Sequence, residues 1–162
     1  MEGEVTDMAK VYVIGAAKGG TAKTVSSYNL AYSLAEKGKK VLAVDMDPQA
    51  NLTTCFGVED TADVPITIGH LMMSVLEEEE LPDASEYVWE REGVDFIPAS
   101  MMLSAVDAKL RLEMGTEKIL SRILDEVKDG YDFVIVDTCP SMGALTINAL
   151  LAADYVIVTA NP

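Results

Sequence analysis

The sequence predicts an α/β domain in which a parallel β-sheet is covered by helices on both faces. Short runs rich in Val and Ile alternate along the chain with longer helical segments, as in successive βαβ units. These runs are almost continuously apolar, which is typical of strands buried on both faces of a sheet. A chain of 162 residues supports one hydrophobic core, so we expect a single domain over residues 1–162.

The first βαβ unit is expected within residues 10–45. Residues 10–15 are an apolar, β-branched run, and residues 24–37 form a helical segment closed by Gly38. Residues 41–45 are a second buried-looking strand that ends in a carboxylate. Because a helix separates the two strands, they are expected to be parallel with a right-handed crossover.

The middle of the chain carries a helix, a strand and a second helix. Residues 65–76 are an apolar helical stretch that runs into four successive glutamates at 77–80, a solvated helix end and loop. Residues 94–98 predict a third strand. A Met- and Leu-rich helix follows at about 101–111, and its apolar face is expected to pack in the core.

The last third predicts two more helices and two more strands. Residues 116–128 have apolar side chains on one helical face, and residues 133–137 form a strand that again ends in a carboxylate. A helix at about 143–152 leads to a fifth strand at 155–159, whose apolar run indicates burial on both faces. Since the sequence stops at Pro162, we expect a C-terminally incomplete sheet, covered either by further segments or by a partner.

Composition excludes broad classes of function. Twelve Lys and Arg against 27 Asp and Glu give a net charge of −15, which repels phosphate backbones and anionic lipids at long range. Nonspecific DNA contact would therefore need an absent region or a local cluster such as Lys37, Lys39 and Lys40. The chain contains no apolar run of the ~20 residues that a bilayer span needs, and its start is acidic, so we expect a cytoplasmic protein with no membrane contact.

Residues 17–24, with the sequence AKGGTAKT, follow a strand and open a helix, as a phosphate-binding loop requires. Backbone N–H groups, the helix N-terminus and Lys23 can attract phosphates, and the Thr24 hydroxyl can bind Mg²⁺. The general GxxxxGK[ST] pattern has Gly where this chain has Ala17 and Ala22. If residue 22 needs a positive φ, its Cβ costs roughly 1–2 kcal/mol. A Gly-rich turn with incidental lysines remains the alternative interpretation.

Four segments together resemble the ParA/MinD family of ATPases. Residues 18–24 resemble its deviant Walker A loop, which is marked by the additional lysine, Lys18. Residues 44–53 (VDMDPQANLT) look like its second motif, and residues 133–141 (FVIVDTCPS) look like its Walker B segment. Residues 145–154 are similar to its usual approach to the next strand. The resemblance implies a P-loop NTPase-like fold, and the Asp-Pro-Gln form of the second motif is closer to the ParA branch.

The resemblance also implies roles for individual residues. Lys23 would contact the β- and γ-phosphates, and Lys18 would reach across a dimer to the partner's ATP. Asp47 would position or activate the attacking water. Thr24, Asp45 and Asp137 would hold the Mg²⁺ or its bound water. The nucleotide-binding residues implied are Lys18, Gly19, Gly20, Thr21, Ala22, Lys23, Thr24 and Val25.

The function that the resemblance implies is that of an ATP-hydrolysing partition protein for plasmids or chromosomes. Such a protein dimerises when ATP is bound, responds to a ParB-like activator and binds nonspecific DNA, here through a region outside this chain. Two alternatives stay open: a non-catalytic nucleotide-dependent binding module, and a MinD-like positioning ATPase for another cargo. Ala22 and Val25 depart from the family pattern and are expected to reduce nucleotide affinity, and Cys139 replaces a usual proline.

Overall fold

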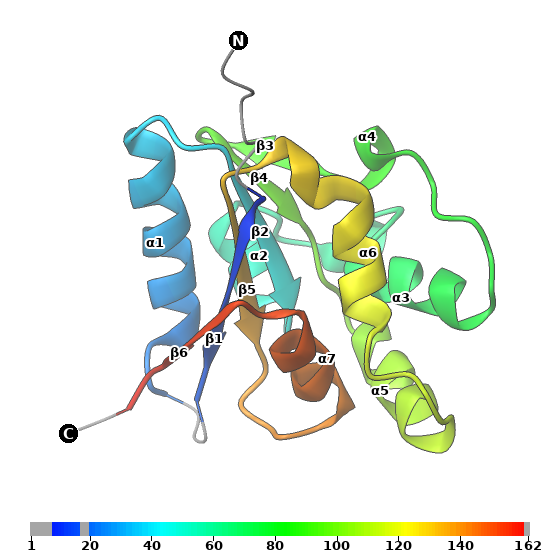
Figure 1. The fold of residues 1–162 in the computed structure, drawn as a ribbon. Coiled ribbons are helices and arrows are strands. Elements are labelled where there is room, and N and C mark those ends of the chain that lie inside the picture. Colours follow the sequence, from blue (N-terminus) through cyan, green and yellow to red (C-terminus); the bar gives the residue numbers. More distant parts are fainter. Residues whose placement is uncertain (1–7, 17–19, 161–162) are drawn as a thin grey trace, which may run out of the picture.

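A six-stranded sheet with the order β3-β4-β2-β5-β1-β6 forms the centre of the molecule (Figure 1). The structure is a computed structural model that describes residues 8–16 and 20–160. The strands are β1 (Lys10–Gly15), β2 (Val41–Met46), β3 (Trp89–Arg91), β4 (Val94–Ile97), β5 (Phe133–Thr138) and β6 (Tyr155–Val158). The helices are α1 (Lys23–Glu36), α2 (Asn51–Cys55), α3 (Ile68–Leu76), α4 (Ala84–Tyr87), α5 (Met102–Leu112), α6 (Ile119–Val127) and α7 (Ala144–Ala152), with 3₁₀ turns at Thr61–Asp63 and Lys128–Gly130.

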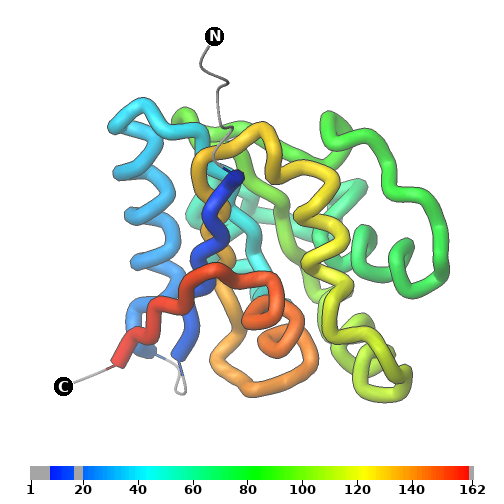
Figure 2. The backbone as a smooth tube through the Cα atoms, viewed as in Figure 1, coloured from blue at the N-terminus to red at the C-terminus, as the bar shows by residue number. Residues whose placement is uncertain are grey.

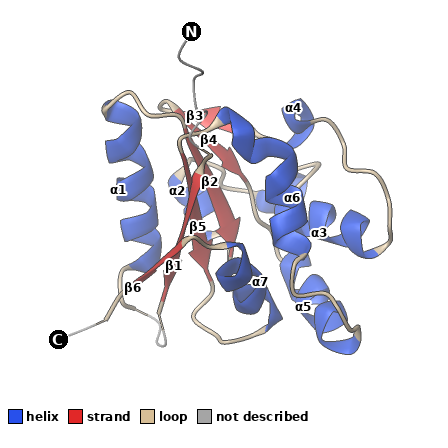
Figure 3. Cartoon of the chain, in the orientation of Figure 1, coloured by secondary structure: helices blue, strands red, loops and turns tan. Residues whose placement is uncertain are grey.

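Helices cover both faces of the sheet, as the sequence predicts (Figure 3). Successive side chains of a strand point to opposite faces, and β5 shows the consequence. Val134 and Val136 join the larger core under α3, α5, α6 and α7, whereas Ile135 joins a smaller core under α1 and α2. All three side chains are fully buried. The continuous apolar runs of the sequence are therefore explained by two-sided burial.

Each of the five expected strands is present, and every pairing among them is parallel. The sequence interpretation missed β3, which pairs antiparallel with β4. A tight turn at Glu92 and Gly93 joins the two, with φ of 52° and 77°, so both turn residues are left-handed as in a type I′ hairpin. The three residues of β3 include two charged ones, which left no apolar periodicity to detect. The sequence interpretation also missed the short helices α2 and α4, because neither is long enough to show a helical period.

The last strand is exposed in this chain, which agrees with the expected C-terminally incomplete sheet, although its apolar run indicates burial on both faces. β6 pairs with β1 along one side and is the outermost strand of the sheet among the described residues. All four of its residues are exposed, from 37% at Ile157 to 71% at Val158. Tyr155 gains one ring contact, a stack on Tyr12 with centroids 4.8 Å apart. The apolar run is real, but no described helix or strand covers it.

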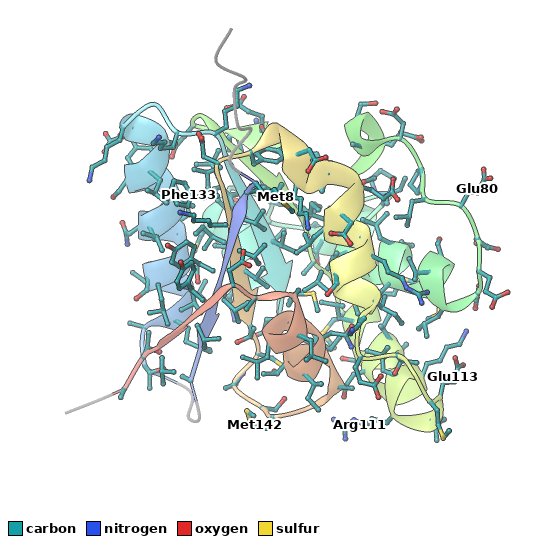
Figure 4. All side chains as sticks on the ribbon, viewed as in Figure 1. Met8, Glu80, Arg111, Glu113, Phe133 and Met142 are labelled. Atoms are coloured by element: carbon teal, nitrogen blue, oxygen red, sulfur yellow. The ribbon has the colours of Figure 1, made fainter. Side chains whose placement is uncertain are left out.

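The carboxyl ends of the parallel strands meet at one end of the molecule. The chain leaves β1 and β5 at the bottom of Figure 2 and enters both strands at the top. Figure 4 labels Phe133, the first residue of β5, near the top and Met142, in the loop after β5, at the bottom. In open α/β sheets ligands bind outside the carboxyl ends of the strands. In the described part of the chain, no helix is long and apolar enough to cross a bilayer.

The contrast between central and edge strands gives a stability test. Ile135→Ala in β5 removes a side chain that is 0% exposed and is expected to lower the free energy of unfolding by about 3–4 kcal/mol. Ile157→Ala in β6 is the matched control, and its loss should be about 1 kcal/mol or less. Urea unfolding of both variants measures the difference. Equal losses would contradict the exposed position of β6.

Candidate functional site

The connection between β1 and α1 turns tightly just before the helix. Gly20 has a φ of 74° and Ala22 a φ of 59°, so both lie in the left-handed region. This confirms that residue 22 needs a positive φ, a conformation for which alanine is poorly suited. Ala22 offers no side-chain cap to α1, so the helix begins with N–H groups available to an anion. The predicted residues Lys18 and Gly19 lie outside the described residues.

The first turn of α1 reaches the end of β5. Lys23 begins the helix and is only 8% exposed. The Thr24 hydroxyl donates a hydrogen bond of 2.7 Å to Asp137 Oδ2, and Ser27 Oγ lies 2.8 Å from Asp137 Oδ1. Burial raises the pKa of Asp137, while the hydroxyls of Thr24 and Ser27 and the charge of Lys23 act against that rise. Both oxygens of Asp137 are thus fixed by residues of α1.

Asp45 lies beside Asp137 because β2 and β5 pair in register, with Asp45 opposite Asp137. Its Oδ2 accepts hydrogen bonds of 2.8 Å from both the N–H and the hydroxyl of Thr53, and its Oδ1 accepts from Asp47 N at 3.1 Å. Burial raises the pKa of Asp45 to about 7, although all three hydrogen bonds favour the ionised form. These bonds shape the turn after β2 that carries Asp47.

Buried negative charge exceeds buried positive charge at this end of the sheet. Asp45, Asp47 and Asp137 are 1%, 5% and 0% exposed, and Lys23 is the one buried lysine or arginine among the described residues. Asp47 and Asp137 repel each other enough to contribute to the raised pKa of Asp137. Charges that are removed from water require partners, so this group of carboxylate oxygens fits a bound cation.

The donor set favours Mg²⁺ over an ion held by protein ligands alone. Within the described ranges, no three His, Cys, Asp or Glu side chains converge closely enough to ligate one ion directly. Mg²⁺ typically keeps several waters and uses one or two protein oxygens together with substrate phosphates. The Thr24 hydroxyl beside Asp137, next to a loop suited to phosphate, matches that requirement.

The remaining predicted residues of the loop point in different directions. Thr21 Oγ1 lies 2.9 Å from Thr159 Oγ1, so the loop is tied to the segment that follows β6. The Thr159 N–H in turn donates to Gly15 O at 3.0 Å. Val25, in the first turn of α1, is 58% exposed.

Ser27, Thr53 and Thr159 were missed as contributors to the site. Ser27 lies four residues after Lys23, so helical periodicity alone would have placed it on the same face. Thr53 stands at the end of the second motif, and its partner Asp45 is eight residues away. No local signal links Thr159 to Thr21, because 138 residues separate them.

Comparison with known proteins identifies the family of this chain. A family model described as an AAA domain matches residues 9–162. Over 151 residues the chain is 39% identical to the sporulation initiation inhibitor protein Soj of Bacillus subtilis and 37% identical to the chromosome-partitioning ATPase Soj of Treponema pallidum. A solved structure of cobyrinic acid a,c-diamide synthase from Mycobacterium smegmatis, with bound ATP analogue and magnesium, is similar with a TM-score of 0.85 and 33% identity.

These matches establish the family. The chain belongs to the AAA-domain family and, within it, to the ParA-type P-loop ATPases. Alignment covers 93% of this chain in both Soj proteins and 94% in the solved structure. It covers 58%, 56% and 60% of those proteins, so the chain spans a little under two thirds of their lengths.

The left-handed alanine before α1 gives a second test. Ala22→Gly removes the Cβ penalty and is expected to raise the free energy of unfolding by about 0.5–1 kcal/mol, part of the gain being offset by chain entropy. Ala35→Gly, the same change inside α1, should instead lower it by about 1 kcal/mol. Urea unfolding of the two variants checks the opposite signs. A loss of stability at both positions would contradict the assigned conformation of Ala22.

The raised pKa of Asp45 predicts a pH dependence of stability. The folded protein keeps the Asp45 proton up to about pH 7, whereas an ordinary aspartic acid releases it near 3.8. The folded state therefore binds more protons between these values, and the free energy of unfolding falls as the pH rises through this window, by about 2–4 kcal/mol. Asp45→Asn should lack this contribution, as urea unfolding at pH 5 and pH 7.5 would show. Identical pH slopes for the two proteins would contradict the assignment.

Proposed function

We propose that this chain is the nucleotide-binding part of a partition ATPase that binds and hydrolyses Mg²⁺-ATP. One observation carries the proposal: the helix that follows the Gly-rich loop places Lys23 and Thr24 against Asp137 at the carboxyl end of β5. The helix N-terminus and Lys23 provide positive charge for the β- and γ-phosphates. The ATP-analogue and magnesium content of the similar M. smegmatis structure supports the same ligands here.

Thr24 and Asp137 are the residues that would hold Mg²⁺, and Asp45 would support the ion or its water from the neighbouring strand. When bound, Mg²⁺ neutralises phosphate charge. The chain's own residues fix the orientation of this set, since Thr24 donates to Asp137 and Thr53 donates to Asp45. The excess of buried carboxylates over Lys23 supports the presence of a cation.

Asp47 is proposed to orient the attacking water. It is 5% exposed and lies in the turn directly after β2, where its Oδ1 accepts a hydrogen bond of 2.9 Å from Gln49 N. Its own N–H is bonded to Asp45. A buried carboxylate fixed in this way near Asp137 is suited to position a water for in-line attack.

ATP-dependent homodimerisation is proposed to occur at this same end of the sheet. Lys18 would then reach the partner's ATP, in keeping with the family resemblance. Segments that follow strands at this end also carry exposed apolar side chains, Met101 after β4 at 60% and Met142 after β5 at 72%. Apolar groups concentrated at one end of a molecule favour a protein partner there.

The cellular role proposed is plasmid or chromosome partition in the cytoplasm, with a ParB-like activator. The relationship to the T. pallidum chromosome-partitioning ATPase supports it. DNA binding is proposed to reside outside this chain. Lys37, Lys39 and Lys40 are exposed but follow the C-terminal end of α1, the end opposite the phosphate loop, and Asp132 bonds to the backbone N–H of Lys40. They therefore form no purely basic surface.

Calorimetry with Mg²⁺-ATP and steady-state turnover test the proposal together. Lys23→Ala should abolish binding, because among the described residues it removes the one buried cation, whose charge acts on Asp137. Lys37→Ala, which changes an exposed lysine just past the same helix, is the matched control and should bind normally. Asp47→Asn should retain binding and lose roughly 10²–10⁴-fold in kcat.

The outcomes separate the proposed function from its alternatives. Binding without turnover in the wild-type chain would favour a non-catalytic, nucleotide-dependent binding module. Turnover stimulated by a protein unrelated to ParB would favour a positioning ATPase for another cargo. Equal binding by the wild type and Lys23→Ala would refute the phosphate loop itself.

A further inference from the structure

Thr53 joins three segments of the chain around one buried hydroxyl. Its side chain, in α2, is 0% exposed. The hydroxyl donates to Asp45 Oδ2 at 2.8 Å and accepts from Ala99 N at 2.9 Å. Both hydrogen-bonding functions of the hydroxyl are therefore used, one towards the end of β2 and one towards the segment after β4.

Asp45 links Thr53 by hydrogen bonds to the turn that carries Asp47. One of its oxygens accepts both bonds from Thr53, and the other accepts from Asp47 N at 3.1 Å. A carboxylate is planar and rigid, so fixing one oxygen fixes the direction of the other. The position of Asp47 thus depends on Thr53, although the two residues share no contact of their own in this network.

The hydroxyl at residue 53 cannot be removed without leaving buried groups unpaired. Asp45 and Ala99 are 1% and 0% exposed, so water does not replace a lost bond freely. Without the hydroxyl, Ala99 N loses its acceptor and Asp45 loses one of three donors. A carboxylate held less firmly can rotate, which would move the Asp47 N–H away from it.

We propose that Thr53 is a positioning residue for ATP hydrolysis, which acts through Asp45 to hold Asp47 in its working orientation. This inference rests on the proposed function, since it assigns Asp47 to water orientation. The proposal predicts that loss of the Thr53 hydroxyl changes turnover and not nucleotide binding, whereas loss of a purely structural threonine would change both. Nucleotide binding depends mainly on Lys23, the phosphate loop and the Thr24–Asp137 pair, whereas turnover depends on the direction of Asp47. Thr53 therefore affects kcat and leaves KM largely unchanged.

The test compares Thr53→Val with Thr54→Val in the 162-residue chain. Valine has the shape of threonine without its hydroxyl, so packing is preserved. Thr54 is the next residue of the same helix. Among the described residues, its hydroxyl donates a hydrogen bond only to Ala50 O. Thr53→Val should lower kcat for Mg²⁺-ATP roughly 10–100-fold and keep KM within about twofold. Thr54→Val should match the wild type, and Thr53→Ser should restore at least about half of the wild-type kcat.

Amide hydrogen exchange supplies a readout that needs no nucleotide. In the free chain, the Asp47 and Ala99 amides should exchange at least about tenfold faster in Thr53→Val than in Thr54→Val. Unchanged exchange at Asp47 would overturn the proposed coupling. If Thr53→Val does not fold, Thr53→Ala replaces it in both measurements with the same expectations.

The kinetic outcomes distinguish this inference from the function on which it rests. Turnover by the wild type, with equal kcat for Thr53→Val and Thr54→Val, would overturn the inference alone. A rise in KM that matches the fall in kcat would also overturn it, because Thr53 would then serve binding. Absence of turnover in the wild-type chain would overturn both proposals.

Discussion

The hydrogen bond between the Thr24 hydroxyl and Asp137 joins the beginning of α1 to the end of β5, and much of the site depends on it. β5 lies between β1 and β2 in the sheet, so Asp137 is placed beside both the phosphate loop and Asp45. Ser27 approaches the second oxygen of the same carboxylate. The sheet therefore sets the spacing of Asp45 and Asp137, and α1 sets the orientation of Asp137. A bound nucleotide would meet groups that are already arranged before it enters.

This arrangement is costly to the folded chain. Burial raises the pKa of both Asp45 and Asp137, which means that their charged forms are disfavoured inside the protein. Ala22 and Ala50, which precede α1 and α2, both have left-handed backbones, with φ of 59° and 52°. Strain and unfavourable charge gathered at one end of a sheet are typical of a site that is stabilised by its ligand. The opposite end of the sheet carries no comparable group of buried carboxylates among the described residues.

An overall charge of −15 does not conflict with an anionic ligand. The field of the whole molecule acts at long range and is screened by salt, whereas the helix N-terminus and Lys23 act at contact. A divalent cation would bring further positive charge to the carboxylates. The negative charge instead disfavours larger polyanionic partners such as DNA, because many phosphates must then approach the protein at once.

The sequence by itself determined the type of each main element and identified the Gly-rich segment between β1 and α1 as the candidate phosphate loop. Two-sided burial leaves continuous apolar runs, and a loop that receives phosphate needs Gly, Lys and Thr at short, fixed spacing. Both patterns can therefore be detected from residues that are close in the sequence.

The tertiary structure decided what depends on distant partners. It showed that Thr53 and Ser27 orient Asp45 and Asp137, which lie 8 and 110 residues away from them. It also showed that β6 is exposed, because an apolar run indicates that a strand can be buried but not which neighbour covers it. Short elements such as β3 escaped prediction, since three residues form a strand only when β4 lies alongside.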